Sequence, residues 1–111
     1  NMQTIVELPE FKRKAEALIS ESQRSGIVNY LAAHPQAGVI IRGTGGIRKL
    51  RWASGNKGKS GGVRVIYYYH NDEIPLFLLS LLGKNEKSNL SMAERNELAK
   101  LTAVLKDSYS I

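Results

Sequence analysis

The stretch that decides the fold is residues 47–82, which contains IRKLRWA at 47–53, VRVIYYY at 63–69 and IPLFLLSLL at 74–82. These segments are rich in β-branched, aromatic and aliphatic residues, and Asn71-Asp72 between the last two is typical of a turn. We therefore predict three antiparallel strands. The last segment is apolar enough to be a central strand.

Helical patterns precede these strands. A short strand is expected over residues 3–8, and Pro9 then suits the first turn of a helix that runs to about Ser20. Ser20 or Ser22 could cap a second helix, which ends at His34-Pro35 because the residue before a proline avoids helical angles. Two short helices joined this closely form a hairpin.

A C-terminal helix and a glycine-rich middle complete the pattern. Ser91 and Glu94 form a capping box, and the apolar stripe that follows is Leu98, Leu101, Val104 and Leu105. Residues 38–62 hold eight of the ten glycines, with an extended segment at 39–41. The sum predicts an α+β fold, with a small antiparallel sheet and helices on one face. The length of 111 residues predicts a single domain over 1–111.

Positive charge is concentrated in one part of the chain. The formal net charge is +6, from 16 Lys and Arg against 10 Asp and Glu. The 50 residues between Glu21 and Asp72 contain no carboxylate, so this segment is +8, and the rest, with eight bases and ten acids, is −2. Such segregation favours a phosphate backbone or an acidic protein as partner over a basic protein whose charge serves solubility alone. The eight bases are Arg24, Arg42, Arg48, Lys49, Arg51, Lys57, Lys59 and Arg64.

Composition and motif context exclude several classes of protein. The chain has no cysteine, which excludes disulfides and cysteine–zinc sites and favours a reducing, cytoplasmic compartment. The longest apolar run, residues 75–82, is too short for a membrane helix, and we expect neither a signal peptide nor a membrane partner. Residues 53–60, ASGNKGKS, fit a relaxed P-loop pattern, but glycines and a strand follow instead of the required helix, so nucleotide hydrolysis is disfavoured.

Side-chain alternation brings basic residues of two neighbouring strands to one face. Lys49 and Arg51 share a face of their strand, and Arg48 lies on the other. Arg64 and Tyr68 share a face of the next strand, so these four residues could be displayed together. The connecting loops add further charged side chains near this face: Lys57, Lys59, Lys84 and Glu86.

A cluster of cations is well suited to a phosphodiester. If the ligand is RNA, its own 2′-hydroxyl is a nucleophile next to the phosphorus. The protein then has to hold the geometry, accept a proton, neutralise the developing charge and protonate the leaving 5′-oxygen. No metal or other cofactor is needed, in keeping with a basic segment that lacks carboxylates for Mg²⁺. Spacing alone leaves both RNA binding and RNA cleavage open, and a DNA-binding regulator is less favoured because no helix carries the charge.

Three sequence blocks resemble a known family. GTGGIRKLR at 43–51, GGVRVIYY at 61–68 and LLSLLGKNE at 78–86 resemble the RelE/HigB-like toxins of type II toxin–antitoxin systems, most closely the HigB branch. The resemblance covers essentially the whole chain. It implies a microbial-RNase-like fold, ribosome-dependent cleavage of mRNA in the A site, and neutralisation by a cognate antitoxin. The implied partners are that antitoxin, mRNA, and the ribosome with its 16S-type rRNA near the A site.

The resemblance also implies roles for individual residues. By motif position, Lys49 and Arg51 match the paired basic residues of the second strand of the family and would orient the phosphate and the 2′-hydroxyl. Arg64 matches the phosphate-contacting arginine of the third strand and would stabilise transition-state charge. The residues expected to hold mRNA or ribosomal RNA are Arg42, Arg48, Lys57 and Lys59.

The sequence departs from the RelE pattern at two positions. Asn85 stands where RelE has an arginine, and Ser91 stands where RelE has a tyrosine. Lys84 is then the expected second cation, and the general base stays open among Tyr68, Glu86 and His70. Ordinary pKa values favour histidine or glutamate over tyrosine near pH 7, and a lysine base would need neighbouring cations.

Overall fold

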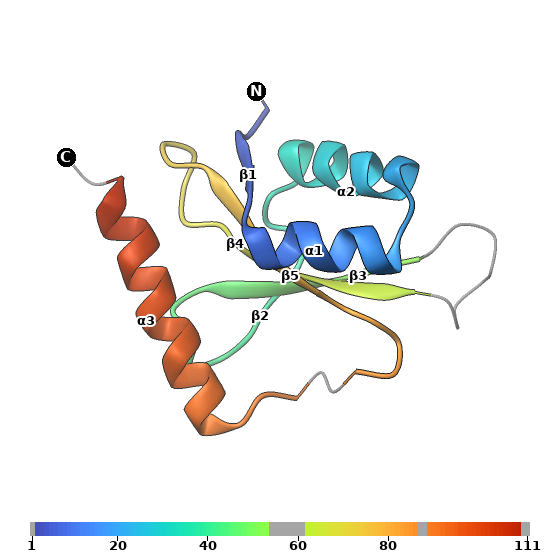
Figure 1. Cartoon of the computed structure of the whole chain (residues 1–111). Coiled ribbons are helices and arrows are strands. Elements are labelled where there is room, and N and C mark those ends of the chain that lie inside the picture. The colour runs from blue at the N-terminus through green and yellow to red at the C-terminus, as the bar shows by residue number, and fades with distance from the viewer. Residues whose placement is uncertain (1, 54–61, 87–88, 110–111) are drawn as a thin grey trace.

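The computed structural model describes residues 2–53, 62–86 and 89–109. These residues form three helices and one five-stranded sheet in the order β1-β5-β4-β3-β2 (Figure 1). The strands are β1 (Ile5–Glu7), β2 (Val39–Ile40), β3 (Ile47–Trp52), β4 (Val63–Tyr68) and β5 (Leu76–Leu82). The helices are α1 (Pro9–Leu18), α2 (Glu21–Ala33) and α3 (Met92–Ser108). The predicted α+β class is confirmed.

The sheet is mixed, which corrects the prediction of an antiparallel sheet. Neighbours β2 to β5 pair antiparallel, but β1 pairs with β5 in parallel, with Ile5 opposite Leu76 and Glu7 opposite Leu78. Strands joined by a tight hairpin must run antiparallel, whereas β1 and β5 are far apart in sequence and are free of that constraint. β5 therefore has a neighbour on each side, as its apolar sequence predicted.

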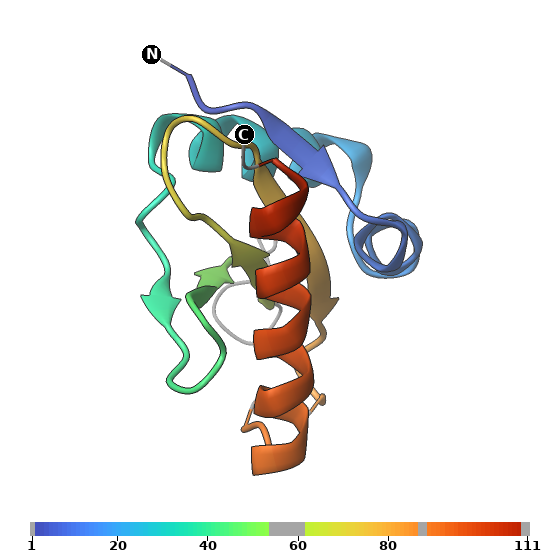
Figure 2. The ribbon, with the colours of Figure 1, turned by 90° about the vertical axis from the view of Figure 1, so that its left-hand side faces the viewer.

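Helices cover both faces of the sheet rather than one. On the first face, α1 and α2 bury Phe11, Ile27 and Leu31 in a core shared with inward side chains of β4 and β5. On the second face, α3 covers a separate core that includes Tyr68 and Phe77, using its stripe of leucines. Figure 2, in which α3 faces the viewer, shows this helix apart from α1 and α2.

Local signals set the ends of the helices. Pro9 occupies the first turn of α1. The predicted caps are present: Ser20, rather than Ser22, forms a capping box with Gln23 at the start of α2, and Ser91 forms one with Glu94 at the start of α3. No helix in the described ranges combines the length and apolarity that crossing a membrane requires.

A glycine turn joins β2 to β3 and fixes both against α3. Gly43, Gly45 and Gly46 have positive φ values of 79°, 79° and 116°, which other residues rarely adopt. Thr44 between them is fully buried, and its carbonyl accepts a hydrogen bond from the Thr102 hydroxyl of α3 at 3.2 Å. The turn therefore sets where β3 starts relative to α3.

Candidate functional site

The strand register brings three basic side chains to the face of the sheet that α3 partly covers. Arg51 lies opposite Arg64 across β3 and β4, and Lys49 lies opposite Ile66 two residues along. We call Lys49, Arg51 and Arg64 the cationic face. Its shared orientation confirms the alternation predicted from the sequence. Arg51 is exposed, whereas Lys49 and Arg64 are half-buried.

Arg64 is anchored from one of its nitrogens. Its Nη2 donates to the carbonyl oxygens of Gly83 and Glu86, each at 3.0 Å, in the turn that follows β5. Its Nε is buried and has no hydrogen-bond partner among the residues that the structure describes. The anchoring carbonyls offset part of the repulsion that two directly opposed cations feel, so Arg64 and Arg51 can stay on one face.

Glu86 is engaged by the protein on both carboxylate oxygens. Oε1 accepts a hydrogen bond from the Gly83 backbone N–H at 2.8 Å, and Oε2 accepts one from Lys14 Nζ at 2.7 Å. The backbone hydrogen bond and then the Lys14 contact lower the pKa of Glu86. This carboxylate is therefore ionised near pH 7, but its basicity is reduced, and a turn-stabilising role accounts for its contacts.

The two other candidates for a general base lie away from Arg64. Tyr68 shares the predicted face but is only 2% exposed, because α3 covers this end of the sheet, and burial raises the pKa of its hydroxyl. The expectation of Tyr68 on an open surface is thus wrong. His70 is exposed, six residues beyond Arg64, which corresponds to roughly 20 Å along an extended strand.

Two bases of the positive segment have structural partners. Arg48 lies on the opposite face of β3 and donates through Nη1 to the carbonyls of Gln36 at 3.2 Å and Gly38 at 2.8 Å. These bonds hold the connection from α2 to β2. Arg48 lies away from the cationic face, as the alternation predicted, and its expected role in holding RNA stays a prediction. Arg24 pairs with Glu7 on β1 at 2.6 Å.

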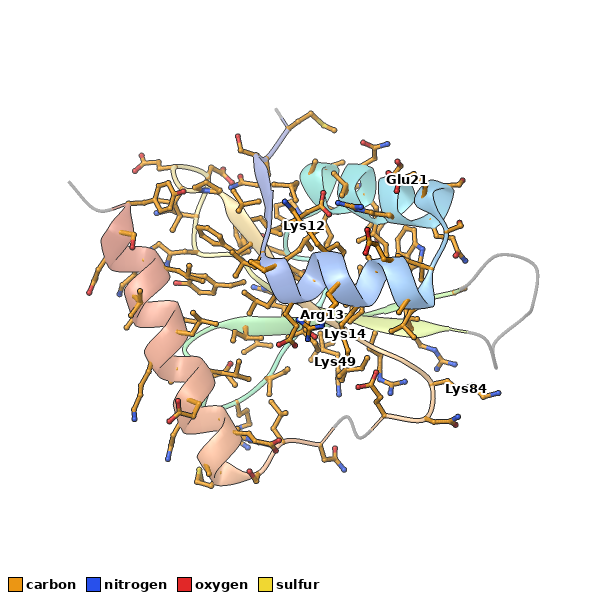
Figure 3. All side chains as sticks on the ribbon, in the orientation of Figure 1. Lys12, Arg13, Lys14, Glu21, Lys49 and Lys84 are labelled. Carbon is orange, nitrogen blue, oxygen red and sulfur yellow. The ribbon has the colours of Figure 1, made fainter. Side chains whose placement is uncertain are left out.

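Two of the remaining predicted residues, Arg42 and Lys84, lie outside the cationic face. Arg42 is exposed on the turn before β3, and Lys84 is exposed after β5 and extends away from Lys49 (Figure 3). Lys57, Lys59 and the rejected P-loop match fall outside the described residues, apart from Ala53. Of the predicted residues that the structure describes, Lys49, Arg51 and Arg64 therefore share one face.

A groove beside the cationic face adds a basic residue that the sequence analysis missed. It has a volume of about 210 Å³ and lies between the β2–β3 hairpin and the start of α3. Arg95 of α3 enters it, held by bonds from Nε to the Leu90 carbonyl at 3.2 Å and from Nη1 to the Arg42 carbonyl at 3.1 Å. Its lining is Val39, Ile40, Ile41, Arg42, Lys49, Asn89, Leu90 and Arg95.

The sequence matches a known family along most of its length. Residues 10–110 match a family model described as the RelE toxin of the RelE/RelB toxin–antitoxin system. The chain belongs to the RelE toxin family. The family part of the resemblance is thereby confirmed, and the cationic face lies within the matched residues of this RelE-family toxin.

The chemistry available at the site of this RelE-family toxin is electrostatic. Three cations share one face, and two of them, Arg51 and Arg64, carry planar forks that suit phosphate oxygens. Within the described ranges, no three His, Asp or Glu side chains gather in a way that could hold a metal ion. Such a surface can bind a phosphodiester and stabilise charge that develops on it.

Lys14 is the second residue that sequence reasoning missed. It belongs to the run Lys12-Arg13-Lys14 on α1 (Figure 3). It contacts Glu86, which is 72 residues away in the sequence. The run of bases was visible in the sequence, but three basic residues in a row on a helix are most simply a solvated face. Only the packing of α1 along β5 shows which of the three reaches the site of this toxin.

Proposed function

We propose that this RelE-family toxin is a ribosome-dependent mRNA endoribonuclease of the HigB-like branch. It cleaves translated mRNA in the A site and so inhibits translation on cytoplasmic ribosomes. The observation that carries the proposal is the register that sets Arg51 opposite Arg64, with Lys49 on the same face, in a member of a toxin family. A phosphodiester is the ligand that best fits three cations on one face of the sheet, with a small groove beside Lys49.

The proposed reaction uses the substrate's own 2′-hydroxyl. The 2′-oxygen forms a bond to phosphorus and loses its proton to a base, the bond from phosphorus to the 5′-oxygen breaks, and that oxygen gains a proton. The products are a 2′,3′-cyclic phosphate and a 5′-hydroxyl end. Arg64 stabilises the charge on the phosphorane, while Lys49 and Arg51 orient the phosphate and the 2′-hydroxyl. No metal takes part in this scheme.

The contacts of the candidate bases narrow the choice of proton acceptor. Tyr68 is buried, His70 lies two residues beyond the end of β4, and Glu86 is held by Gly83 and Lys14. We therefore favour a lysine of the cationic face as the proton acceptor. Lys49 is the lysine of that face. Lys84 would serve as a second cation at the rim.

A cognate antitoxin is the proposed protein partner. The family description pairs RelE toxins with RelB antitoxins, so we propose a RelB-type protein that neutralises this toxin. The chain's formal charge of +6 favours an acidic antitoxin segment. Co-expression with the gene adjacent to the toxin gene should restore growth that the toxin alone stops.

Mapping of mRNA ends after brief induction tests the catalytic proposal. We expect new 5′ ends inside codons of translated messages, and their loss when the message lacks a start codon. Arg64→Ala should remove these ends. Blocked translation with intact mRNA would instead identify a non-catalytic RNA- or ribosome-binding protein of the same fold, and equal cleavage of naked RNA would refute the dependence on ribosomes.

A further inference from the structure

The turn at residues 83–86 binds one nitrogen of the Arg64 guanidinium. The Glu86 N–H donates to the Gly83 carbonyl at 3.1 Å, and the Glu86 carboxylate accepts from the Gly83 N–H at 2.8 Å. The backbone and the side chain of Glu86 thus both bond to Gly83 and close the turn. The closed turn presents the carbonyls of Gly83 and Glu86 to a single nitrogen of Arg64, each at 3.0 Å. The position of the Arg64 guanidinium therefore depends on this turn.

Lys14 binds the carboxylate oxygen of Glu86 that the turn itself does not use. Glu86 Oε1 is used by the Gly83 N–H, and Oε2 is bound by Lys14 Nζ at 2.7 Å. The Lys14 side chain is 23% exposed and that of Glu86 is 42% exposed, so the pair lies at the surface but is not fully solvated. Lys12 and Arg13, its neighbours on α1, are both exposed (Figure 3).

A carboxylate this close to Arg64 has an alternative partner. Arg64 Nη2 already donates to the carbonyl of Glu86 at 3.0 Å, which places the carboxylate of the same residue near the guanidinium, and the charge of Arg64 is a minor contribution to the lowered pKa of Glu86. A guanidinium and a carboxylate form strong two-pronged pairs when they are free to turn toward each other. If Glu86 made such a pair, it would neutralise Arg64 and compete with a phosphate. Lys14 draws the carboxylate toward α1 and so keeps Arg64 available.

We propose that Lys14 is a positioning residue for Arg64. Its ion pair with Glu86 holds the turn at 83–86 in the form that anchors Arg64, and it keeps the Glu86 carboxylate from pairing with Arg64 directly. The role of Glu86 is then to fix the turn rather than to accept a proton. This inference rests on the function proposed above, because it assigns Arg64 to the scissile phosphate.

Substitution of Lys14 should slow cleavage with little effect on binding. In a cleavage assay with ribosomes programmed with mRNA, we expect Lys14→Ala to lower kcat on the order of 10- to 100-fold, with KM near the wild-type value, as misplaced catalytic groups do. Lys12→Ala removes the same charge from the same helix without touching Glu86 and should keep wild-type kcat. Lys14→Arg retains the ion pair and should recover most of the rate. Equal rates for the Lys14→Ala and Lys12→Ala variants would overturn the proposal.

A second pair of variants tests whether Lys14 acts through Glu86. Glu86→Gln can still accept from the Gly83 N–H but loses the charge that binds Lys14. Lys14→Ala should therefore add little further loss when combined with Glu86→Gln, because both break one interaction. Independent, multiplying losses would mean that Lys14 acts elsewhere. If Glu86 were the general base, Glu86→Gln would abolish cleavage and remove the acid limb of the pH–rate profile; we expect partial activity with the limb retained.

A measurement on the free toxin separates this inference from the proposed activity. The Nε–H group of Arg64 gives its own signal in ¹H–¹⁵N correlation spectra, assigned by its loss in Arg64→Lys. We expect Lys14→Ala, and the closer isostere Lys14→Gln, to shift or broaden this signal, and Lys12→Ala to leave it in place. An unmoved Arg64 signal in folded Lys14 variants refutes positioning whatever the cleavage activity. A moved signal in a protein that cuts no mRNA refutes the proposed function and leaves the positioning of Arg64 standing.

Discussion

Arg51 and Arg64 face each other across β3 and β4, so two guanidinium side chains leave the same side of the sheet at directly opposed positions. Like charges in such a pair destabilise a sheet, which makes the arrangement costly unless a ligand or the protein offsets it. Among the residues that the structure describes, Arg64 is anchored to two carbonyls of the turn after β5, whereas Arg51 is exposed. A bound phosphate would offset the remainder, and an anchored Arg64 suits the transition-state role that the family resemblance implies for it.

Arg64→Ala should therefore lower the cleavage rate by about 10²–10³-fold, the usual cost of losing one donor to a developing charge. The fold should survive, because the side chain is half-buried and water can reach the carbonyls that it leaves. Cleavage in the ribosome assay and circular dichroism of the free protein check the two halves of the prediction. Wild-type turnover in a folded Arg64→Ala variant would show that another residue carries the charge.

Arg48→Ala should lower the stability of the protein more than its cleavage activity. Its guanidinium holds the Gln36 and Gly38 carbonyls, so its loss leaves acceptors of the α2–β2 connection without a charged donor. We expect the free energy of unfolding to fall by about 1–3 kcal/mol, with cleavage per folded molecule far less affected than in Arg64→Ala. Urea denaturation and activity, measured on one preparation, test this. A stable Arg48→Ala protein that no longer binds RNA would restore the contact role expected from its sequence position.

The sequence alone predicted the features of the fold that depend on neighbouring residues, but not those that depend on packing between elements far apart in the chain. Caps act within one turn of a helix, so Ser91 correctly predicted where α3 begins, and Ser20, one of two candidate caps, is the one that starts α2. The layering was not predicted, although β5 carries apolar residues on both faces, such as Leu76 and Leu78 in one core and Phe77 in the other. Such a strand needs cover on both sides, but periodicity does not say which helix covers which face.

At the candidate site too, local pattern predicted some features and tertiary packing decided the others. Alternation placed Lys49, Arg51 and Arg64 on one face because neighbouring strands share a pleat, and the register confirms it. The burial of Tyr68 depends on how α3 packs, and the Lys14–Glu86 pair joins residues 72 positions apart. Neither could be read from local pattern, since both follow from tertiary packing.

The glycine-rich loop offers a test based on charge alone. Lys57 and Lys59 stand in the positive segment between β3 and β4, where the sequence predicts contacts with RNA. Lys57→Ala combined with Lys59→Ala should weaken association with ribosomes and flatten its dependence on salt, because a protein that neutralises fewer phosphates releases fewer counterions. Binding measured across a range of salt concentrations gives the slope. A slope equal to that of the wild type would place the RNA-binding surface elsewhere.

The pKa of Glu86 predicts how stability changes in acid. Since contacts with Gly83 and Lys14 lower this pKa in the folded protein, the unfolded chain binds the proton more readily. The stabilising contribution of Glu86 is therefore present above its unfolded pKa, at about 4.3, and is lost as the pH falls through the lower folded value. Solvent screening keeps the effect small, because the side chain is 42% exposed. Denaturation of wild type and Glu86→Gln should show a difference at pH 7 that disappears in strong acid; a difference that grows in acid would contradict the pKa direction.

Gly43 and Gly45 provide a matched pair for the junction between the β2–β3 turn and α3. Both have a φ of 79°, so alanine at either position is strained by about 1–2 kcal/mol. A Cβ at Gly43 would have ordinary contact with Arg95, whereas one at Gly45 would collide with the Thr102 hydroxyl. That hydroxyl shares its one proton between the carbonyls of Ala99 at 2.8 Å and Thr44 at 3.2 Å, so turning it away from a new Cβ would break these contacts.

Gly45→Ala should therefore destabilise the protein by about 1–3 kcal/mol more than Gly43→Ala, the usual cost of overpacking. The excess should largely disappear in a Thr102→Ala background, because the colliding hydroxyl is gone while the backbone strain remains. Urea denaturation of the four variants and the Thr102→Ala parent measures both effects. Equal losses at Gly43 and Gly45 would mean that α3 moves aside at little cost, and that the turn carrying Arg42 toward the cationic face is not set by Thr102.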